Sequence, residues 1–122
     1  MRQSVGYKSS SFLEYDMGVY KELDLSIQEY VHHLEMDYGK NGYNGKDFYY
    51  EVGRKYVHVI MQDTGENTFK QRSSHSWIMI NDDAKFKQGD ILKSASWNAP
   101  ARNFARGNVF SCDYSNIRWC GI

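Results

Sequence analysis

Arg102 and Arg106 are the side chains whose type and spacing point most directly to a chemical task. They lie four residues apart in a segment that begins at Pro100, the only proline of the chain, and ends at Gly107. Proline suits the first turn of a helix and glycine its end, so Pro100–Gly107 predicts a short helix. Both guanidinium groups would then share one outward face. We therefore predict an anionic partner: a phosphate group, a nucleic-acid backbone or an acidic protein surface.

The charges around this arginine pair are unevenly distributed along the chain. The whole sequence is neutral, with 15 basic and 15 acidic side chains, which excludes a generic polyanion binder of the histone-like class. Residues 84–110 nevertheless carry five basic side chains and one acidic one, a net charge of +4. This stretch either meets an anion or is a solvated face whose charges pair with Asp82, Asp83 or the acidic N-terminal helix. On the first interpretation, the predicted binding residues are Arg54, Lys55, Lys85, Lys87, Lys93, Trp97, Arg102 and Arg106.

Two tryptophans, Trp77 and Trp97, lie in or just after predicted strands. A tryptophan in such a place usually belongs to the core, because it buries a large area, but it can also serve as a stacking surface. Strand aromatics such as Tyr49 and Tyr56 could likewise stack bases. The chain has no motif of the kind found in RNA-recognition sheets, so core packing is the preferred interpretation for these aromatic residues.

The histidines and cysteines do not form a motif typical of an enzyme or a metal site. His58 and His75 lie on candidate neighbouring strands, where they could act as the acid and base of a small hydrolase. The chain lacks a phosphate-binding loop, a Gly-x-Ser-x-Gly turn and a His-Glu-x-x-His motif. Cys112 and Cys120 are too few for a zinc site, and we expect both to be reduced. We therefore predict no catalytic residue, no metal and no cofactor, with the hydrolase kept as an alternative.

The hydrophobic pattern predicts the helices that must position these residues. Residues 24–38 give the clearest helix, because apolar side chains recur at spacings of three and four along one stripe. Residues 12–22 show a weaker helical pattern that Gly18 interrupts. Residues 1–11 are polar and serine-rich, as in a frayed terminus. The stripe consists of Leu23, Ile27, Tyr30, Val31, Leu34 and Tyr38.

After residue 47 the pattern changes to one that favours strands. Aromatic and β-branched residues are concentrated in 48–52, 55–61, 76–80 and 91–95. Helices and strands are segregated along the chain, which favours an α+β fold with an antiparallel sheet. We predict a single domain over residues 1–122. It would consist of an N-terminal helix or helix pair packed on three to four antiparallel strands, with a short C-terminal helix.

Three stretches of the chain resemble a family of small tailed-bacteriophage proteins. They are Gly-Arg-Lys-Tyr-Val-His-Val-Ile at 53–60, Ser-His-Ser-Trp-Ile at 74–78, and the longer stretch 89–108. The last contains Gly-Asp-Ile-Leu-Lys-Ser-Ala-Ser-Trp-Asn-Ala-Pro-Ala and ends in Ala-Arg-Gly-Asn. The resemblance covers about residues 53–110 and implies a phage setting, in the cytoplasm of an infected bacterial cell. The resemblance supplies no established activity and no catalytic residues that could be carried over to this chain.

Together these observations predict a small protein that acts by binding rather than by catalysis. In a phage setting we expect the partner to be a host protein or protein–nucleic-acid complex, such as a nucleic-acid-guided defence complex that the protein inhibits in the manner of an anti-CRISPR. The alternative is a nucleic-acid-binding accessory protein that uses the basic face of residues 84–110. No stretch of 18 apolar residues occurs, so we expect no membrane partner.

Overall fold

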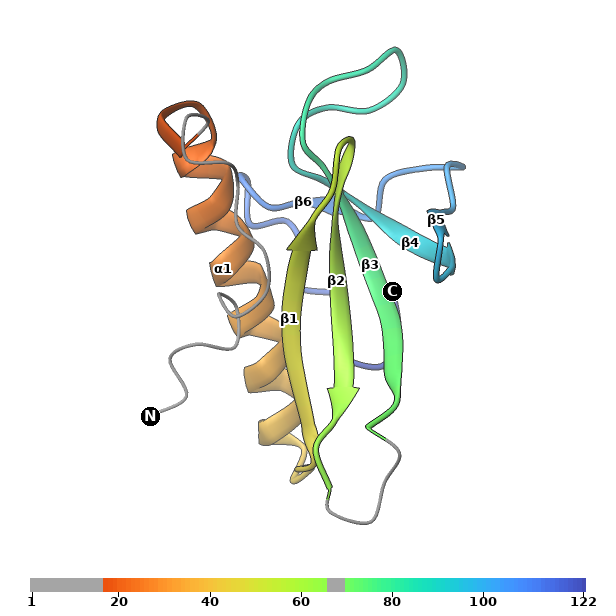
Figure 1. Ribbon diagram of the computed structural model, residues 1–122. Helices are drawn as coiled ribbons and strands as arrows, with labels where there is room; N and C mark the ends of the chain where they lie inside the picture. Colours follow the sequence, from red (N-terminus) through yellow and green to blue (C-terminus); the bar gives the residue numbers. More distant parts are fainter. Residues whose placement is uncertain (1–16, 66–69) are drawn as a thin grey trace.

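The protein consists of one long helix and one antiparallel sheet (Figure 1). The computed structural model describes residues 17–65 and 70–122. The predictions for residues 1–11, and for the first part of 12–22, lie outside this range. Strands β1 to β5 lie in sequence order across the sheet, and β6 pairs with β4. The elements are α1 (Met17–Lys40), β1 (Lys46–Val52), β2 (Tyr56–Asp63), β3 (Arg72–Met79), β4 (Asp90–Ser96), β5 (Ala99–Pro100) and β6 (Gly107–Asn108).

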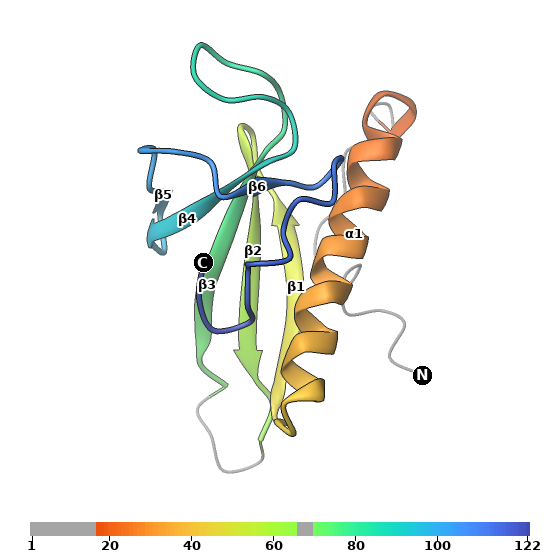
Figure 2. The ribbon, with the colours of Figure 1, turned by 180° about the vertical axis from the view of Figure 1, so that it is seen from behind.

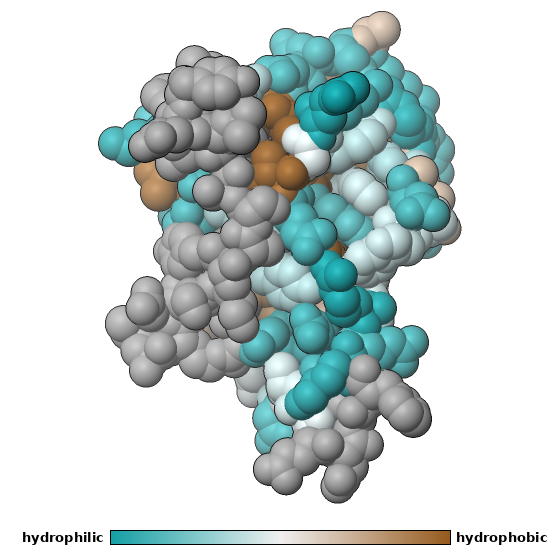
Figure 3. All heavy atoms as spheres, in the orientation of Figure 1, coloured by the Kyte–Doolittle hydropathy of each residue, from teal (hydrophilic) through white to brown (hydrophobic). Residues whose placement is uncertain are grey.

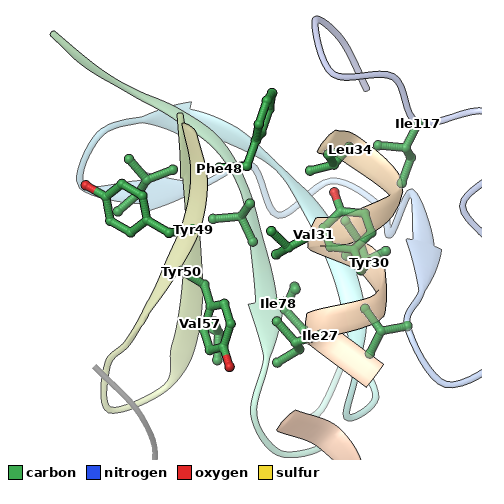
Figure 4. Packing of buried hydrophobic residues seen from close by; sticks show 14 of the residues in the cluster. Ile27, Tyr30, Val31, Leu34, Phe48, Tyr49, Tyr50, Val57, Ile78 and Ile117 are labelled. Carbon is green, nitrogen blue, oxygen red and sulfur yellow. The ribbon is translucent and has the colours of Figure 1, made fainter. Parts of the chain in front are cut away.

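Helix α1 covers one face of the sheet and supplies six of the buried residues of the main core (Figure 2). The predicted apolar stripe is confirmed, since each of its six side chains is buried. Figure 4 shows four of them, from Ile27 to Leu34, directed toward the strands. Phe48 and Tyr50 of β1 meet them from the sheet, and the Tyr50 hydroxyl donates to the buried Asp24 carboxylate at 2.6 Å. Gly18 lies within α1 and does not interrupt it.

The opposite face of the sheet, which we call the open face, carries a second and smaller core. Side chains alternate between the two faces along each strand. Phe48 and Tyr50 therefore face α1, whereas Tyr49 lies on the open face. Segments 82–89 and 101–106 cover part of this face, because Phe86 and Ala105 pack on the strand residues there. The buried members of this core are Trp77, Met79, Phe86 and Leu92.

The ladder between β2 and β3 contains one extra residue, His75. Val59 pairs with Ser76 and the next residue, Ile60, pairs with Ser74, so His75 has no partner on β2. Strand β4 continues the sheet only opposite Ser76 to Ile78. Beyond this point β3 and β4 diverge, and their serines approach through side chains instead. A β-bulge of this kind redirects the side chains beside it.

The predicted fold class is wrong in two respects. The sheet has six strands rather than three to four, and no helix follows α1 in the described residues. The segment predicted as a helix, Pro100–Gly107, instead pairs with β4. Ala101 N–H donates to Lys93 and Arg106 N–H to Ile91, each at 2.7 Å. A helix of eight residues is marginal by itself, so these long-range hydrogen bonds decide the conformation. The broader α+β description does fit the structure.

The last residues of the chain lie on the α1 side of the sheet. Segment 109–122 has little regular structure, yet Ile117 is buried in the main core. Asp37 of α1 holds the segment, because its carboxylate accepts from Arg118 Nε at 3.0 Å and from the Trp119 N–H at 2.9 Å. These hydrogen bonds lower the pKa of Asp37. Segment 109–122 thus completes the core beside the helix.

Candidate binding surface

Segment 97–106 places two exposed aromatic rings on the open-face side of the sheet. Trp97 is 39% exposed and Phe104 is 56% exposed. Ala105, between Phe104 and Arg106, packs on the second core and so fixes the segment to the sheet. In the view of Figure 3 the surface is mainly hydrophilic, and strongly apolar atoms occupy only a small area. Exposed aromatic rings on such a surface are candidates for contact with a partner.

Trp97 is held in place by a group of stacked planar side chains. Its ring lies edge-on to His58, with centroids 4.7 Å apart. His58 in turn lies parallel to the buried Trp77, at 3.8 Å and an angle of 5°. The guanidinium of Arg72 lies 4.8 Å from the Trp97 ring centre. Trp77 is thus a core residue, as preferred from the sequence, whereas Trp97 is partly offered to solvent.

Arg72 is a member of this site that the sequence prediction missed. Its Nε donates to the Tyr49 hydroxyl at 2.7 Å, and Nη2 donates to Glu51 at 2.8 Å. The sequence pattern predicts this strand only from residue 76 onward, because the first residues of β3 are polar, and so leaves Arg72 outside it. Only the pairing of Arg72 with Gln62 of β2 brings it onto the open face. No signal in the local sequence identifies this residue.

Arg102 is engaged by the protein itself. Its Nη2 donates to Asp83 at 2.7 Å, its Nη1 donates to the Tyr56 hydroxyl at 2.8 Å, and its guanidinium lies 4.8 Å from the centre of the Phe86 ring. Hydrogen bonds from the N–H groups of Phe86 and Lys85, and then from Arg102, hold the pKa of Asp83 far below its usual range. Because residues 100–107 do not form a helix, the guanidinium groups of Arg102 and Arg106 do not lie together on one outward helix face, as the sequence predicted.

Arg106 has a different environment, in which no Asp or Glu side chain of residues 17–65 and 70–122 takes part. Its guanidinium stacks 3.9 Å from the centre of the exposed Phe104 ring. Nη1 donates to the main-chain oxygen of Ile122 at 3.2 Å, and Nη2 has only a long contact of 3.4 Å to Asn103 Oδ1. Within the described residues, the buried Nε has no hydrogen-bond partner. Arg106 is therefore a half-buried cation with incomplete hydrogen bonding.

Most of the other predicted cations gather at one end of the sheet. Arg54 and Lys55 form the turn between β1 and β2, and Lys85 and Lys87 lie in the β3–β4 loop. The two loops meet there, since Lys55 lies 3.6 Å from Asp83 and Lys85 Nζ donates to the main-chain oxygen of Arg102. Lys93 lies apart, in β4. In the described part of the chain, Arg54, Lys87 and Lys93 form no ion pair.

The two histidines proposed as an acid–base pair are separated by the sheet. His58 lies on the open face, stacked on Trp77. His75 lies on the helix face, where its Nδ1 is 2.9 Å from Ser76 Oγ and its Nε2 donates to the Arg118 carbonyl at 2.9 Å. Because these residues project from opposite faces, they cannot act together on one substrate.

His58 and two neighbouring serines form a hydrogen-bonded chain that resembles a nucleophile and its base. The hydrogen bonds in this chain are donated in the wrong direction for such a role. His58 Nε2, Ser74 Oγ and Ser94 Oγ follow one another at 2.6 Å, and Ser94 donates to the Ser96 carbonyl at 2.7 Å. A carbonyl can only accept, so all contacts are satisfied only if Ser74 donates to Ser94 and His58 donates to Ser74. His58 Nε2 therefore carries the proton and has no lone pair with which to activate Ser74.

Other kinds of site find little support in the described residues. A cavity of about 260 Å³ next to Ser74, Ser94 and Cys120 is lined by hydroxyl groups whose protons are already donated. Residues 17–65 and 70–122 contain no cluster of three His, Cys, Asp or Glu side chains able to hold a metal ion. Both cysteines are exposed free thiols. None of the helices in this part of the chain is long and apolar enough to cross a membrane.

Comparison with known proteins places the chain in a family. No curated protein and no solved structure matches it. One family model, described as a family of unknown function (DUF7717), matches residues 3–120. This match covers nearly the whole chain, including α1, every strand and the aromatic segment 97–106. The chain therefore belongs to the DUF7717 family.

Proposed function

We propose that the protein is a small non-enzymatic binding protein whose partner is another protein. The contact would be the aromatic–arginine surface, which we define as Trp97, Phe104 and Arg106. The observation that carries the proposal is the exposure of two aromatic rings in one segment, each with a guanidinium stacked on it. Tryptophan, phenylalanine and arginine are enriched at protein–protein interfaces and supply much of their binding energy.

The phage setting, which the sequence resemblance suggests, narrows the expected partner to a macromolecule of the bacterial host. A phage protein that binds without catalysis can act by occupying a host machine. A nucleic-acid-guided defence complex is one such machine, and the protein would then be an anti-CRISPR-like inhibitor. This part of the proposal is supported by the resemblance of residues 53–110, and the choice of surface by the geometry of segment 97–106.

Replacing both exposed rings should abolish partner binding. We expect the Trp97→Ala/Phe104→Ala variant to lose at least about tenfold in affinity, because truncating one interface aromatic often costs more than 1.4 kcal/mol. The measurement is affinity capture from host lysate, with bound proteins identified and quantified by mass spectrometry. The matched control is Leu25→Ala/Met36→Ala, which removes two exposed apolar side chains from α1 and should capture as much as the parent.

The outcomes of the capture experiment are distinct. A guided nuclease complex that depends on the two rings would support defence inhibition, and another ring-dependent host protein would restrict the proposal to host binding. Equal recovery by the parent and the Trp97→Ala/Phe104→Ala variant would contradict the proposed surface.

The second candidate function is nucleic-acid binding, favoured by the cations at the end of the sheet. Arg54 and Lys87 form no ion pair in the described residues and could contact phosphates. On this alternative, the affinity for a 20-nucleotide strand should fall at least about tenfold between 50 and 200 mM salt, because cation release weakens phosphate contacts. Fluorescence anisotropy measures this, with Arg54→Glu/Lys87→Glu as the variant that should lose binding. Absence of binding at 50 mM salt would exclude the alternative.

A further inference from the structure

The C-terminal end of α1 and the last segment of the chain form a polar cavity on the helix side of the sheet. Segment 109–122 runs beside α1 there, as the dark blue trace in Figure 2 shows. The cavity has a volume of about 310 Å³, which lies at the small end of the range for ligand sites. Every lining side chain is polar or charged: His33, Asp37, Lys40, Asn41, Ser115 and Arg118.

The guanidinium of Arg118 is held at one atom and free at the other two. Its Nε donates to both oxygens of Asp37, at 3.0 and 3.1 Å. Within the described residues, Nη1 and Nη2 have no partner, and the side chain is 54% exposed. The Nη1–Nη2 edge of a guanidinium matches two oxygens of one oxyanion. On Arg118 this edge is accessible from solvent, and Asp37 has already fixed the orientation of the group.

Lys40 and Ser115 supply further donors to the same cavity. Both side chains are exposed, and neither forms a hydrogen bond or an ion pair within the described residues. Lys40 is the last residue of α1, where free carbonyl groups could repel an anion. One of these carbonyls, that of Gly39, already accepts from the Gly42 N–H at 2.9 Å. The cavity therefore offers donors from α1 and from segment 109–122.

The charge of the cavity favours an anion although one carboxylate lines it. Asp37 is the only acidic side chain among the lining residues, and Lys40 and Arg118 are two cations, so the formal net charge is +1. The Asp37 carboxylate is already bound by Arg118 and by the Trp119 N–H at 2.9 Å. Its side chain is only 12% exposed, so an incoming anion would meet the cations first.

We propose that this cavity is a binding site for the phosphate group of a small molecule, either a phosphate monoester or the free phosphate ion. Such a group carries a charge of about −1.5 to −2 at neutral pH and three accepting oxygens. These oxygens can accept from Arg118, Lys40 and Ser115 together, whereas a carboxylate has only two. The site is independent of the proposed function, because Trp97 and Phe104 belong to the open-face side of the sheet.

A titration followed by ¹⁵N-correlated NMR at pH 7.5 and constant ionic strength tests the site. Inorganic phosphate and glycerol 3-phosphate should shift the N–H resonances of Lys40, Ser115 and Arg118 saturably. Acetate should bind at least about tenfold more weakly, because it cannot accept from all three side chains. Tighter binding of glycerol 3-phosphate would assign the site to a monoester, and equal or tighter binding of inorganic phosphate would assign it to the free ion.

Substitutions of the two cations test which groups hold the phosphate. Lys40→Gln changes an exposed side chain and should weaken glycerol 3-phosphate binding about five- to tenfold. The matched control, Lys21→Gln, removes an exposed lysine from the other end of α1 and should bind like the parent. Arg118→Lys keeps the charge but loses the paired donors, and it should weaken binding at least about tenfold.

Three results would overturn the phosphate site. The first is the absence of shifts at about 20 mM phosphate, where a site with a millimolar Kd would be nearly filled. The second is an equal loss in Lys40→Gln and Lys21→Gln, which would show general attraction to a cationic protein. The third is tighter binding of a short thymidine strand, whose phosphodiesters carry one charge each. None of these results affects the aromatic–arginine surface, which the capture experiment tests separately.

Discussion

Gly107→Ala should destabilise the protein by about 3 kcal/mol or more, which exceeds ordinary overpacking because the obstacle is main chain. A Cβ at position 107 would overlap the carbonyl oxygen of Asp113. The obstructing atom lies in the backbone of the C-terminal segment, so no side-chain rotation relieves the overlap. Either β6 must leave β4 or the segment from Asp113 onward must move, and the second change would pull Ile117 out of the core.

Urea denaturation and thermal melting of Gly107→Ala measure this effect. For a chain of this length, 3 kcal/mol corresponds to a fall in Tm of roughly 10 °C. The matched control is Gly39→Ala in α1, where a Cβ would have open space. We expect the control to keep or raise stability by up to about 1 kcal/mol, because alanine favours helix. A Gly107→Ala variant as stable as the parent would show that β6 does not hold the C-terminal segment in place.

Stability should fall as the pH drops from about 6.5 to about 4, because two histidines are kept neutral in the folded state. Burial lowers the pKa of His58 from 6.5 to about 4, and the charge of Arg72 adds to this. Burial also lowers the pKa of His75. In this range the unfolded chain binds protons that the folded protein does not, so acid favours unfolding. The full shift at His58 is worth about 3 kcal/mol, and we expect about 1–3 kcal/mol after solvent screening.

Chemical denaturation at pH 7, 5.5 and 4 measures this dependence. His58→Gln keeps a nitrogen donor near Ser74 but cannot titrate, so the slope of stability against pH should become shallower. The lowered pKa values of Asp37 and Asp83 affect stability only as the pH falls below about 4, the ordinary pKa of aspartate. Histidine ¹⁵N shifts provide a second readout, with His58 and His75 both carrying the proton on Nε2 at pH 7. An unchanged slope in His58→Gln would show that His58 is not the titrating group.

The elements that the sequence predicted well are those with a strong local pattern. The six apolar side chains of α1 recur at helical spacing over 15 residues, and burying that stripe is what holds the helix on the sheet. Strands β1, β2 and β4 are rich in aromatic and β-branched residues, and all three were located. The start of β3 was placed too late, because Arg72, Ser73 and Ser74 are polar and gain their strand conformation from pairing with β2.

The errors in the candidate site come from contacts between residues distant in sequence. Pro100 and Gly107 are typical helix boundaries, yet both became strand residues because β4 offered main-chain partners. The partnership of Arg102 with Asp83 links positions 19 residues apart, and that of Arg72 with Glu51 links positions 21 apart. Local periodicity holds no information about such pairs. The sequence could therefore name the cations and Trp97 but could not show which cation stays incompletely bonded.

His75 is the extra residue of the bulge in β3, so its deletion would not rearrange the sheet. If its codon were deleted, Ser74 and Ser76 would become neighbours, and their partners Ile60 and Val59 are already adjacent in β2. The ladder would close into a regular one, with every other side chain still on its present face. The hydrogen bonds of His75 to the Arg118 carbonyl and to Ser76 Oγ would disappear. A homologue that lacks this residue can therefore have the same fold. It would differ in how strongly the C-terminal segment is bound to the sheet.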